Sequence, residues 1–286
     1  MNWLTRHILR PAVVAAAFLA VAQHAALAQG SIFLTGHDPD FHASLGGNSV
    51  GAQHINQRAI SFIMNPTFNP FVSGGVNKFL YVESNIPVPG GHTRGVNGIT
   101  ASGYINGVHF EWHTASDLNT ELSLLGTKYS GIVVASDFGG TLTSAELSIL
   151  NARKTDIISF LNAGGGLYAM AESNSGAHLT GSEPKFGFLP FVPSSVNVDQ
   201  NESGFTVTPF GAALGLTAGD VNGNASHNVF TSSAGMNIVD MDANGQIMSL
   251  AVRSHVSEQG VVPEPATLML FGTGLVVLAG GMRRRR

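Results

Sequence analysis

Six acidic or histidine side chains follow predicted strands, a position where α/β proteins commonly bind ligands. They are His37, Asp38, Asp40, Glu83, Asp137 and Glu172. Carboxylate oxygens and imidazole nitrogens bind divalent cations, and the same groups can hydrogen-bond the hydroxyls of a sugar. The pattern therefore predicts a binding crevice for a cation or a sugar. Strand-end acids also form turns and cap helices, and the sequence leaves that alternative open.

The predicted connectivity brings these side chains to one edge of a sheet. Neighbouring parallel strands joined by right-handed crossovers point the same way, so the residues just past each strand converge. Four acids are expected at the centre of the site: Asp38, Asp40, Asp137 and Glu172. Three histidines could supply hydrogen-bond donors or metal ligands there: His37, His42 and His227. Carboxylates this close repel one another, which raises the pKa of at least one unless a cation or donors offset the charge.

A second pattern places His109, Glu111 and His113 at alternate positions of one strand. Their side chains should share one face of that strand. A His-x-Glu-x-His face could bind a metal, but ligands at this spacing usually need a further partner from elsewhere in the chain. Without such a partner, we favour a solvated strand face.

The clearest structural unit begins at Tyr129. Residues 131–135 are apolar on both faces, as in a central parallel strand. A capping box at residues 143–146 starts a long helix that ends at Gly164. Residues 167–171 then return as a strand, so these two strands should be parallel neighbours in a βαβ unit.

The remaining elements extend this unit into one α/β domain, expected at residues 29–258. Strands are predicted at residues 31–35, 79–82 and 108–113, and a helix capped by Asn48 should end before Pro66. Asn244-Gly245 predicts a hairpin between residues 236–241 and 246–252. We expect a mostly parallel sheet flanked by helices, with this C-terminal hairpin at its edge.

Composition limits the chemistry. The chain has no cysteine, which excludes disulfides, thiolate metal sites and cysteine nucleophiles. Residues 29–262 contain 8 Lys/Arg and 17 Asp/Glu, a formal charge of −9. An acidic surface repels phosphate backbones, so we expect no nucleic-acid partner.

Residues 129–174 resemble the class I glutamine amidotransferase-like superfamily, which has a flavodoxin-like fold. The resemblance lies in the 131–135 strand, the capped helix, and Ala163-Gly164-Gly165-Gly166-Leu167 leading into the next strand. Catalytic members of this superfamily carry a nucleophilic cysteine at the position that corresponds to about Ala171, so this chain lacks the nucleophile. No serine elbow replaces it, because Ala171-Glu172-Ser173-Asn174-Ser175 lacks the glycines of Gly-x-Ser-x-Gly. Residues 227–230 are similar to a histidine-containing loop of trehalose-utilisation-like relatives. The family's glutamine hydrolysis is therefore not expected, and we assign no catalytic residue.

The N-terminal end of the chain is typical of a targeting segment. Residues 1–28 combine a basic start, an apolar stretch and Ala26-Leu27-Ala28. This is the pattern of a cleavable signal peptide, with cleavage expected after Ala28.

The C-terminal end resembles the PEP-CTERM sorting signal, expected at residues 262–286. Residues 266–282 are uncharged and just long enough for a membrane helix. A Pro-Glu-Pro motif precedes this apolar segment and a cluster of arginines follows it: Pro263, Glu264, Pro265, Arg283, Arg284, Arg285 and Arg286. The resemblance implies processing by an exosortase after signal peptidase, and delivery from the inner membrane to the cell surface or extracellular matrix.

These features predict an exported surface protein with a non-catalytic binding or structural role. Its partners would be the processing enzymes, the membrane through the C-terminal helix, and an extracellular polysaccharide. The alternative is a carboxylate- or metal-dependent hydrolase on the same fold. No resident cofactor is expected, although a divalent cation could bind the strand-end acids.

Overall fold

The computed structural model describes residues 29–88, 92–173, 179, 183–189, 191, 193–198, 203–257 and 260–262. The expected signal peptide at residues 1–28 lies outside them. So do all the named residues of the expected sorting signal: Pro263, Glu264, Pro265, Arg283, Arg284, Arg285 and Arg286. Among the described residues, no helix is long and apolar enough to cross a membrane. The membrane helix expected at residues 266–282 stays a prediction, since it also falls outside them.

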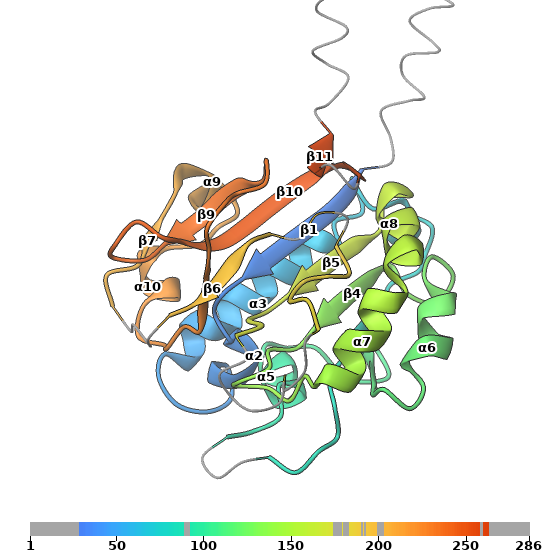
Figure 1. The fold of residues 1–286 in the computed structure, drawn as a ribbon, viewed down its shortest axis with the longest axis horizontal. Helices are drawn as coiled ribbons and strands as arrows, with labels where there is room; N and C mark the ends of the chain where they lie inside the picture. The colour runs from blue at the N-terminus through green and yellow to red at the C-terminus, as the bar shows by residue number, and fades with distance from the viewer. Residues whose placement is uncertain are drawn as a thin grey trace, which may run out of the picture.

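One mixed sheet organises the described residues (Figure 1). Its strands are β1 (Gly30–Thr35), β2 (Phe79–Val82), β3 (Phe110–His113), β4 (Gly131–Val134), β5 (Gly166–Ala169), β6 (Ser195–Asn197), β7 (Thr206–Val207), β8 (Asn228–Phe230), β9 (Asn237–Met241), β10 (Ile247–Ser257) and β11 (Gly260–Val262). The order is β3-β2-β4-β5-β1-β10-β8-β6, with β9 and β11 paired to β10 and β7 paired to β9. The first five strands in this order are parallel, and β10 runs antiparallel to β1.

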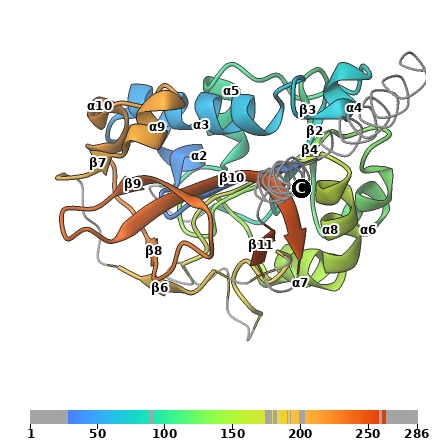
Figure 2. The ribbon, with the colours of Figure 1, turned by 90° about the horizontal axis from the view of Figure 1, so that it is seen from above.

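Helices cover both faces of the sheet (Figure 2). They are α2 (Pro39–His42), α3 (Ser49–Ile63), α4 (Pro70–Ser73), α5 (Val96–Ala101), α6 (Leu118–Glu121), the 3₁₀ turn η1 (Leu122–Leu124), α7 (Ser144–Ala152), α8 (Lys154–Asn162), α9 (Pro209–Ala213) and α10 (Ala218–Val221). α3 and α5 lie on one face, and α7 lies on the other. The four residues of β4 are all buried, as expected for a strand covered on both faces.

The predicted α3 is confirmed, with one exception on its apolar face. Asn48 caps it by accepting a hydrogen bond from Gly51 N at 3.0 Å. Ile55, Ala59 and Ile63 are buried in the core, but Val50 is 60% exposed. Val50 lies in the first turn, which contacts α10 through Asn48 on another side of the helix.

The single long helix expected after Thr143 is wrong. The chain forms α7 and α8, which meet at Arg153. Arg153 lies outside ideal helical geometry, with φ −96° and ψ 16°, and serves as the end of one helix and the start of the next. The capping box of Thr143 and Glu146 is present as predicted.

The α/β class and the parallel pairing of β4 with β5 are confirmed, in the register Gly131↔Gly166 to Val134↔Ala169. The flavodoxin-like class is not. Flavodoxin has the strand order 2-1-3-4-5, whereas the parallel strands here follow the order 3-2-4-5-1. The β9–β10 hairpin forms as predicted, but β10 is a central strand between β1 and β8 rather than an edge.

The chain enters and leaves the sheet at the same end. Gly30 pairs with Ser254, so β1 begins where β10 is close to its end. β11 then pairs back onto β10, with Val262 opposite His255. The beginning of β1 and β11 therefore lie together at the amino edge of the parallel strands (Figure 1).

Candidate functional site

Asp38 lies at the centre of the candidate site, between β1 and α2, and is 1% exposed. Its Oδ2 lies 3.1 Å from His227 Nε2. Its Oδ1 lies 3.4 Å from His42 Nε2. Three of the predicted residues, from the end of β1, α2 and the segment before β8, are therefore in direct contact.

Five aromatic rings form a chain of contacts that begins and ends at this carboxylate. The ring centroid of Phe41 lies 4.8 Å from that of His42 and 5.3 Å from that of His92. Phe138 continues the chain, 5.1 Å from His92 and 4.4 Å from His227. The group is called the Asp38 ring below, and consists of Asp38, Phe41, His42, His92, Phe138 and His227. Phe41, His92 and Phe138 are half-buried.

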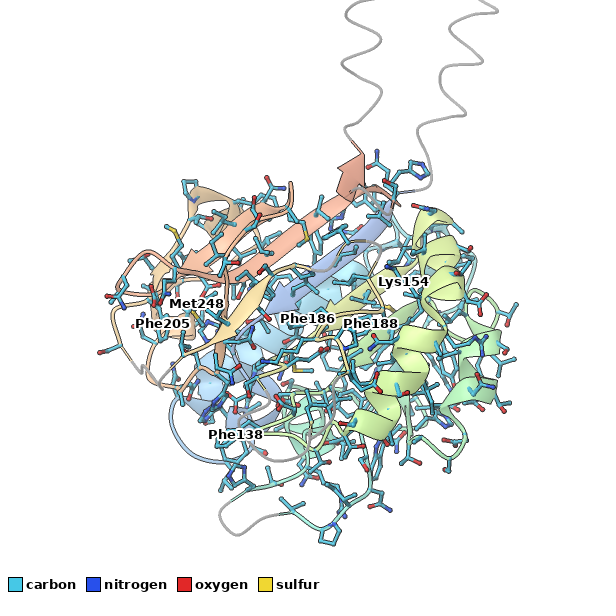
Figure 3. All side chains as sticks on the ribbon, in the orientation of Figure 1. Phe138, Lys154, Phe186, Phe188, Phe205 and Met248 are labelled. Atoms are coloured by element: carbon cyan, nitrogen blue, oxygen red, sulfur yellow. The ribbon has the colours of Figure 1, made fainter. Side chains whose placement is uncertain are left out.

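The Asp38 ring lies away from the end where the chain enters and leaves the sheet. Figure 3 shows Phe138 on the far side of the molecule from β11. β1 spans six residues, which corresponds to about 20 Å along the strand. The ring is thus at the carboxyl edge of the parallel strands, as the sequence predicted for this site.

The loop after β4 passes so close to Asp38 that it requires glycine. A Cβ atom at Gly139 would lie 2.1 Å from Asp38 Oδ2 and 2.4 Å from Phe41 Cβ. Neither distance is compatible with van der Waals packing. Gly139 therefore lets the loop that carries Phe138 pack directly against Asp38 and Phe41.

Asp40 holds the same loop through hydrogen bonds. Its Oδ1 accepts hydrogen bonds from Ser136 Oγ at 2.7 Å and from Phe41 N at 3.0 Å. Its Oδ2 accepts one from Ser136 N at 2.8 Å. Burial, reinforced by the charge of Glu83, raises the pKa of Asp40 to about 7.

Glu83 ties two loops to the end of β2. Its Oε1 accepts hydrogen bonds from Gly95 N at 2.6 Å, Thr141 N at 3.0 Å and Thr141 Oγ1 at 3.1 Å. Its Oε2 accepts one from Val96 N at 2.9 Å. Burial raises the pKa of Glu83, although these hydrogen bonds act in the opposite direction.

Asp137 and Glu172 form a further pair beside the ring. Asp137 Oδ1 accepts hydrogen bonds from Ser173 N at 2.7 Å and Ser173 Oγ at 3.1 Å. Glu172 Oε2 accepts one from Phe186 N at 2.5 Å. Burial raises the pKa of Glu172 to about 8, and the charge of Asp137 adds to the rise.

His37 does not join the other predicted residues. Its Nε2 lies 2.8 Å from Asp240 Oδ2, and its ring lies 5.2 Å from that of Phe205. The side chain therefore faces β9 and the antiparallel part of the sheet. Its position directly after β1 is as predicted, but its direction depends on a strand more than two hundred residues away.

The raised pKa values have a different main cause from the one expected. For Asp40, Glu83 and Glu172, burial is the largest contribution, and repulsion between carboxylates adds to it only for Asp40 and Glu172. His227 shows the opposite balance. Burial lowers its pKa, but the charges of Asp38, Asp137 and Asp40 together raise the pKa above its usual value. Three acids of this edge therefore favour the protonated form of His227.

Three residues of the Asp38 ring were missed from the sequence. Phe41 and Phe138 directly follow Asp40 and Asp137, so an aromatic residue next to a strand-end acid was the available signal. His92 lies in a Gly/Pro-rich loop and gave none.

A cavity of about 360 Å³ lies elsewhere, at the amino edge of β2 and β3. Met64, Phe79, Tyr104 and His109 are among its lining residues. None of the strand-end acids borders it. It therefore does not coincide with the predicted site at the carboxyl edge.

Comparison with known families matches residues 261–286 to the PEP-CTERM protein-sorting motif. The match spans the whole of the predicted Pro-Glu-Pro motif and the whole of the arginine cluster at residues 283–286. It supports an exosortase substrate, exported to the cell surface through a membrane-anchored intermediate. Neither curated proteins nor solved structures gave a match. The amidotransferase-like resemblance of residues 129–174 therefore has no support beyond the sequence pattern itself.

Proposed function

We propose that this exported protein is a non-catalytic binding protein whose Asp38 ring recognises a hydroxyl-rich ligand, such as a segment of extracellular polysaccharide. The supporting observation is the arrangement of half-buried aromatic rings around a carboxylate flanked by two imidazoles. Ligand sites commonly combine apolar ring surfaces with a few polar groups that fix orientation. Here the rings would pack on the apolar face of a sugar, while Asp38, His42 and His227 would bond its hydroxyls.

The position of the sorting motif favours such a role. The motif begins within β11, at the amino edge of the parallel strands, whereas the Asp38 ring lies at the carboxyl edge. A chain held at the membrane through its C-terminus would direct the ring away from the lipid surface. Glu83 and Asp40 have their oxygens occupied by loop hydrogen bonds, so we assign them to positioning the ring.

Binding is tested by replacing Phe138 with alanine. On an array of neutral and acidic polysaccharides, Phe138→Ala should weaken binding by the full-length chain about tenfold or more, since losing an aromatic anchor removes at least about 1.4 kcal/mol. The matched control is Phe68→Ala, because Phe68 is 39% exposed and lies outside the ring. Equal binding by both variants and the parent chain would rule out this surface.

Sorting is tested by fractionating cells that express the chain with an internal epitope tag. We expect signal-peptide cleavage after Ala28 and exosortase-dependent release to the surface. In cells without exosortase, the protein should accumulate in the inner membrane. An uncleaved, full-length protein in the cytoplasm would contradict the prediction.

The second candidate is hydrolysis, which the contact between Asp38 and His227 favours. A buried carboxylate that orients an imidazole is the arrangement of a general base. A screen on esters, glycosides and amides separates the two functions. Turnover by the wild type that Asp38→Asn abolishes would support the hydrolase. The divalent cation expected at the strand-end acids remains a prediction, which a melting-temperature shift with Ca²⁺ or Zn²⁺ would test.

A further inference from the structure

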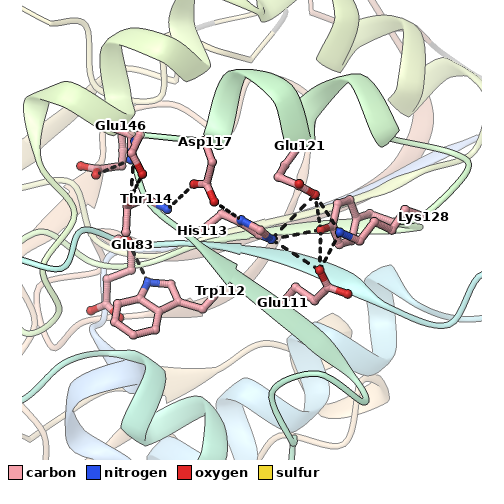
Figure 4. Close-up of polar contacts among 12 residues, drawn as sticks. Glu83, Glu111, Trp112, His113, Thr114, Asp117, Glu121, Lys128 and Glu146 are labelled. Atoms are coloured by element: carbon pink, nitrogen blue, oxygen red, sulfur yellow. Dashed lines mark hydrogen bonds and ion pairs between the residues drawn. The ribbon is translucent and has the colours of Figure 1, made fainter.

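Glu111, His113 and Glu121 form a compact group of metal-ligating side chains on β3 and α6 (Figure 4). One atom from each lies within 4.8 Å of the other two. Glu111 and His113 belong to β3, the last strand of the parallel part of the sheet, and Glu121 ends α6. Glu121 is the further ligand that the alternating pattern of β3 lacked in the sequence. His109 is not part of the group, because its Nδ1 accepts a hydrogen bond from Ile105 N at 3.0 Å.

The orientation of His113 is fixed by a carboxylate on its far side. His113 Nδ1 lies 2.7 Å from Asp117 Oδ2, and Asp117 Oδ1 accepts a hydrogen bond from Thr114 N at 3.2 Å. With Nδ1 bonded in this way, Nε2 faces Glu111 and Glu121, at 3.6 and 3.7 Å from their Oε2 atoms. Histidines that bind metals through one nitrogen usually donate the other N–H to a carboxylate or carbonyl. The arrangement of Asp117 and His113 has that form.

Tyr129 adds a fourth donor atom at the same point. Its hydroxyl donates to Glu121 Oε2 at 2.5 Å, and the oxygen also lies 3.1 Å from Glu111 Oε2 and 3.1 Å from His113 Nε2. Four ligand atoms from β3, α6 and the segment before β4 thus surround a single position.

The ammonium of Lys128 already bridges two of these ligands. Lys128 Nζ lies 2.6 Å from Glu111 Oε2 and 2.9 Å from Glu121 Oε2. Lys78 Nζ lies 2.8 Å from the other oxygen of Glu111, Oε1, so this carboxylate already accommodates positive charge on both of its oxygens. The side chain of Lys128 is 34% exposed, and a lysine ammonium is a point charge on a flexible stem. It can therefore leave for solvent without disturbing the backbone.

We propose that Glu111, His113 and Glu121 bind a divalent ion of the zinc class, which displaces the ammonium of Lys128. One imidazole and two carboxylates suit such an ion, and three protein ligands with a fourth oxygen from Tyr129 or water complete a tetrahedral set. The bound ion would tie β3 to α6. None of these residues belongs to the Asp38 ring, so the proposal does not depend on the proposed function.

The test is a zinc titration of the full-length chain by calorimetry, with melting temperature as a second readout. The wild type should bind one Zn²⁺ and melt at a higher temperature with it. His113→Ala should weaken binding about 100-fold or more, and Asp117→Asn about 10- to 100-fold, as is usual for a partner behind a metal-binding histidine. Lys128→Met removes the competing cation and should tighten binding about tenfold. The matched control is His109→Ala, which should bind as the wild type does.

Two results would overturn the proposal. The first is the absence of zinc binding by the wild type, even if Lys128→Met binds, because Lys128 would then be the permanent cation of the group. The second is binding that survives both His113→Ala and Glu121→Gln, because the ion would then lie elsewhere. Two variants are used so that a folding failure of one still leaves a decisive measurement.

Discussion

Replacement of Glu83 by alanine is expected to lower the free energy of unfolding by about 3 to 5 kcal/mol, the range for breaking a buried hydrogen-bond network. Glu83 is fully buried. Its removal leaves Gly95 N, Val96 N and Thr141 N without their acceptor, whereas the Thr141 hydroxyl can still donate to Ser84 O at 2.9 Å. Each buried donor without a partner is destabilising by about 1 to 3 kcal/mol. Partial relaxation of the two loops explains why the expected total is smaller than the sum.

Urea unfolding of the full-length chain measures this effect. Glu83→Gln should be less destabilising than Glu83→Ala, because one oxygen remains to accept while the amide nitrogen faces other donors. The matched control is Asp156→Ala, which removes an acid that is 56% exposed and paired with Arg153 on the surface. Its effect should stay within about 0.5 kcal/mol. A loss below about 1 kcal/mol for Glu83→Ala would mean that the loops do not depend on this carboxylate.

The parts of the fold that follow from short sequence patterns were predictable. The apolar runs of β4 and β5 and the capping box between them specify a βαβ unit, because each signal is local and the crossover has a preferred hand. The same reasoning located the strand-end acids at one edge. It failed for the helix between those strands, because the break at Arg153 lies within an uninterrupted helical pattern.

The position of β10 was not predicted, although one signal was present. Met248 to Val252 are consecutive and all buried, which is typical of a strand covered on both faces. The Asn-Gly turn favoured an edge hairpin instead. Pairing of β10 with β1 joins residues more than two hundred positions apart, and no local pattern encodes that contact.

Within the candidate site, residue types were predictable and their partners were not. Asp38, Glu83 and His37 all follow strands, yet Asp38 contacts histidines, Glu83 accepts backbone hydrogen bonds, and His37 turns toward Asp240. Those outcomes depend on loops and strands that approach from distant parts of the chain. Likewise, Glu121 completes the group on β3 only because α6 packs beside it.

Glu172 predicts a pH dependence of stability that a single substitution should remove. Burial raises the pKa of its carboxyl from 4.5 to about 8, so the folded chain keeps a proton that the unfolded chain loses above pH 4.5. Stability from this group is complete below that pH and is lost as pH rises toward 8. The loss is on the order of 5 kcal/mol, at about 1.4 kcal/mol for each pKa unit. Asp40, with a pKa of about 7, acts in the same direction between its ordinary pKa of 3.8 and 7.

The substitution that isolates this effect is Glu172→Gln. Glu172 Oε2 accepts from Phe186 N, while Oε1 has no hydrogen-bond partner among the described residues. A glutamine can therefore keep the one hydrogen bond and place its amide nitrogen where the proton of the acid would be. Melting temperatures should match the wild type at pH 4 and exceed it increasingly from pH 5 to 8. The variant should keep a slope below pH 7, because Asp40 still titrates. If the difference in melting temperature between the two proteins were the same at every pH, Glu172 would be ionised in the folded protein, with a cation or another donor beside it.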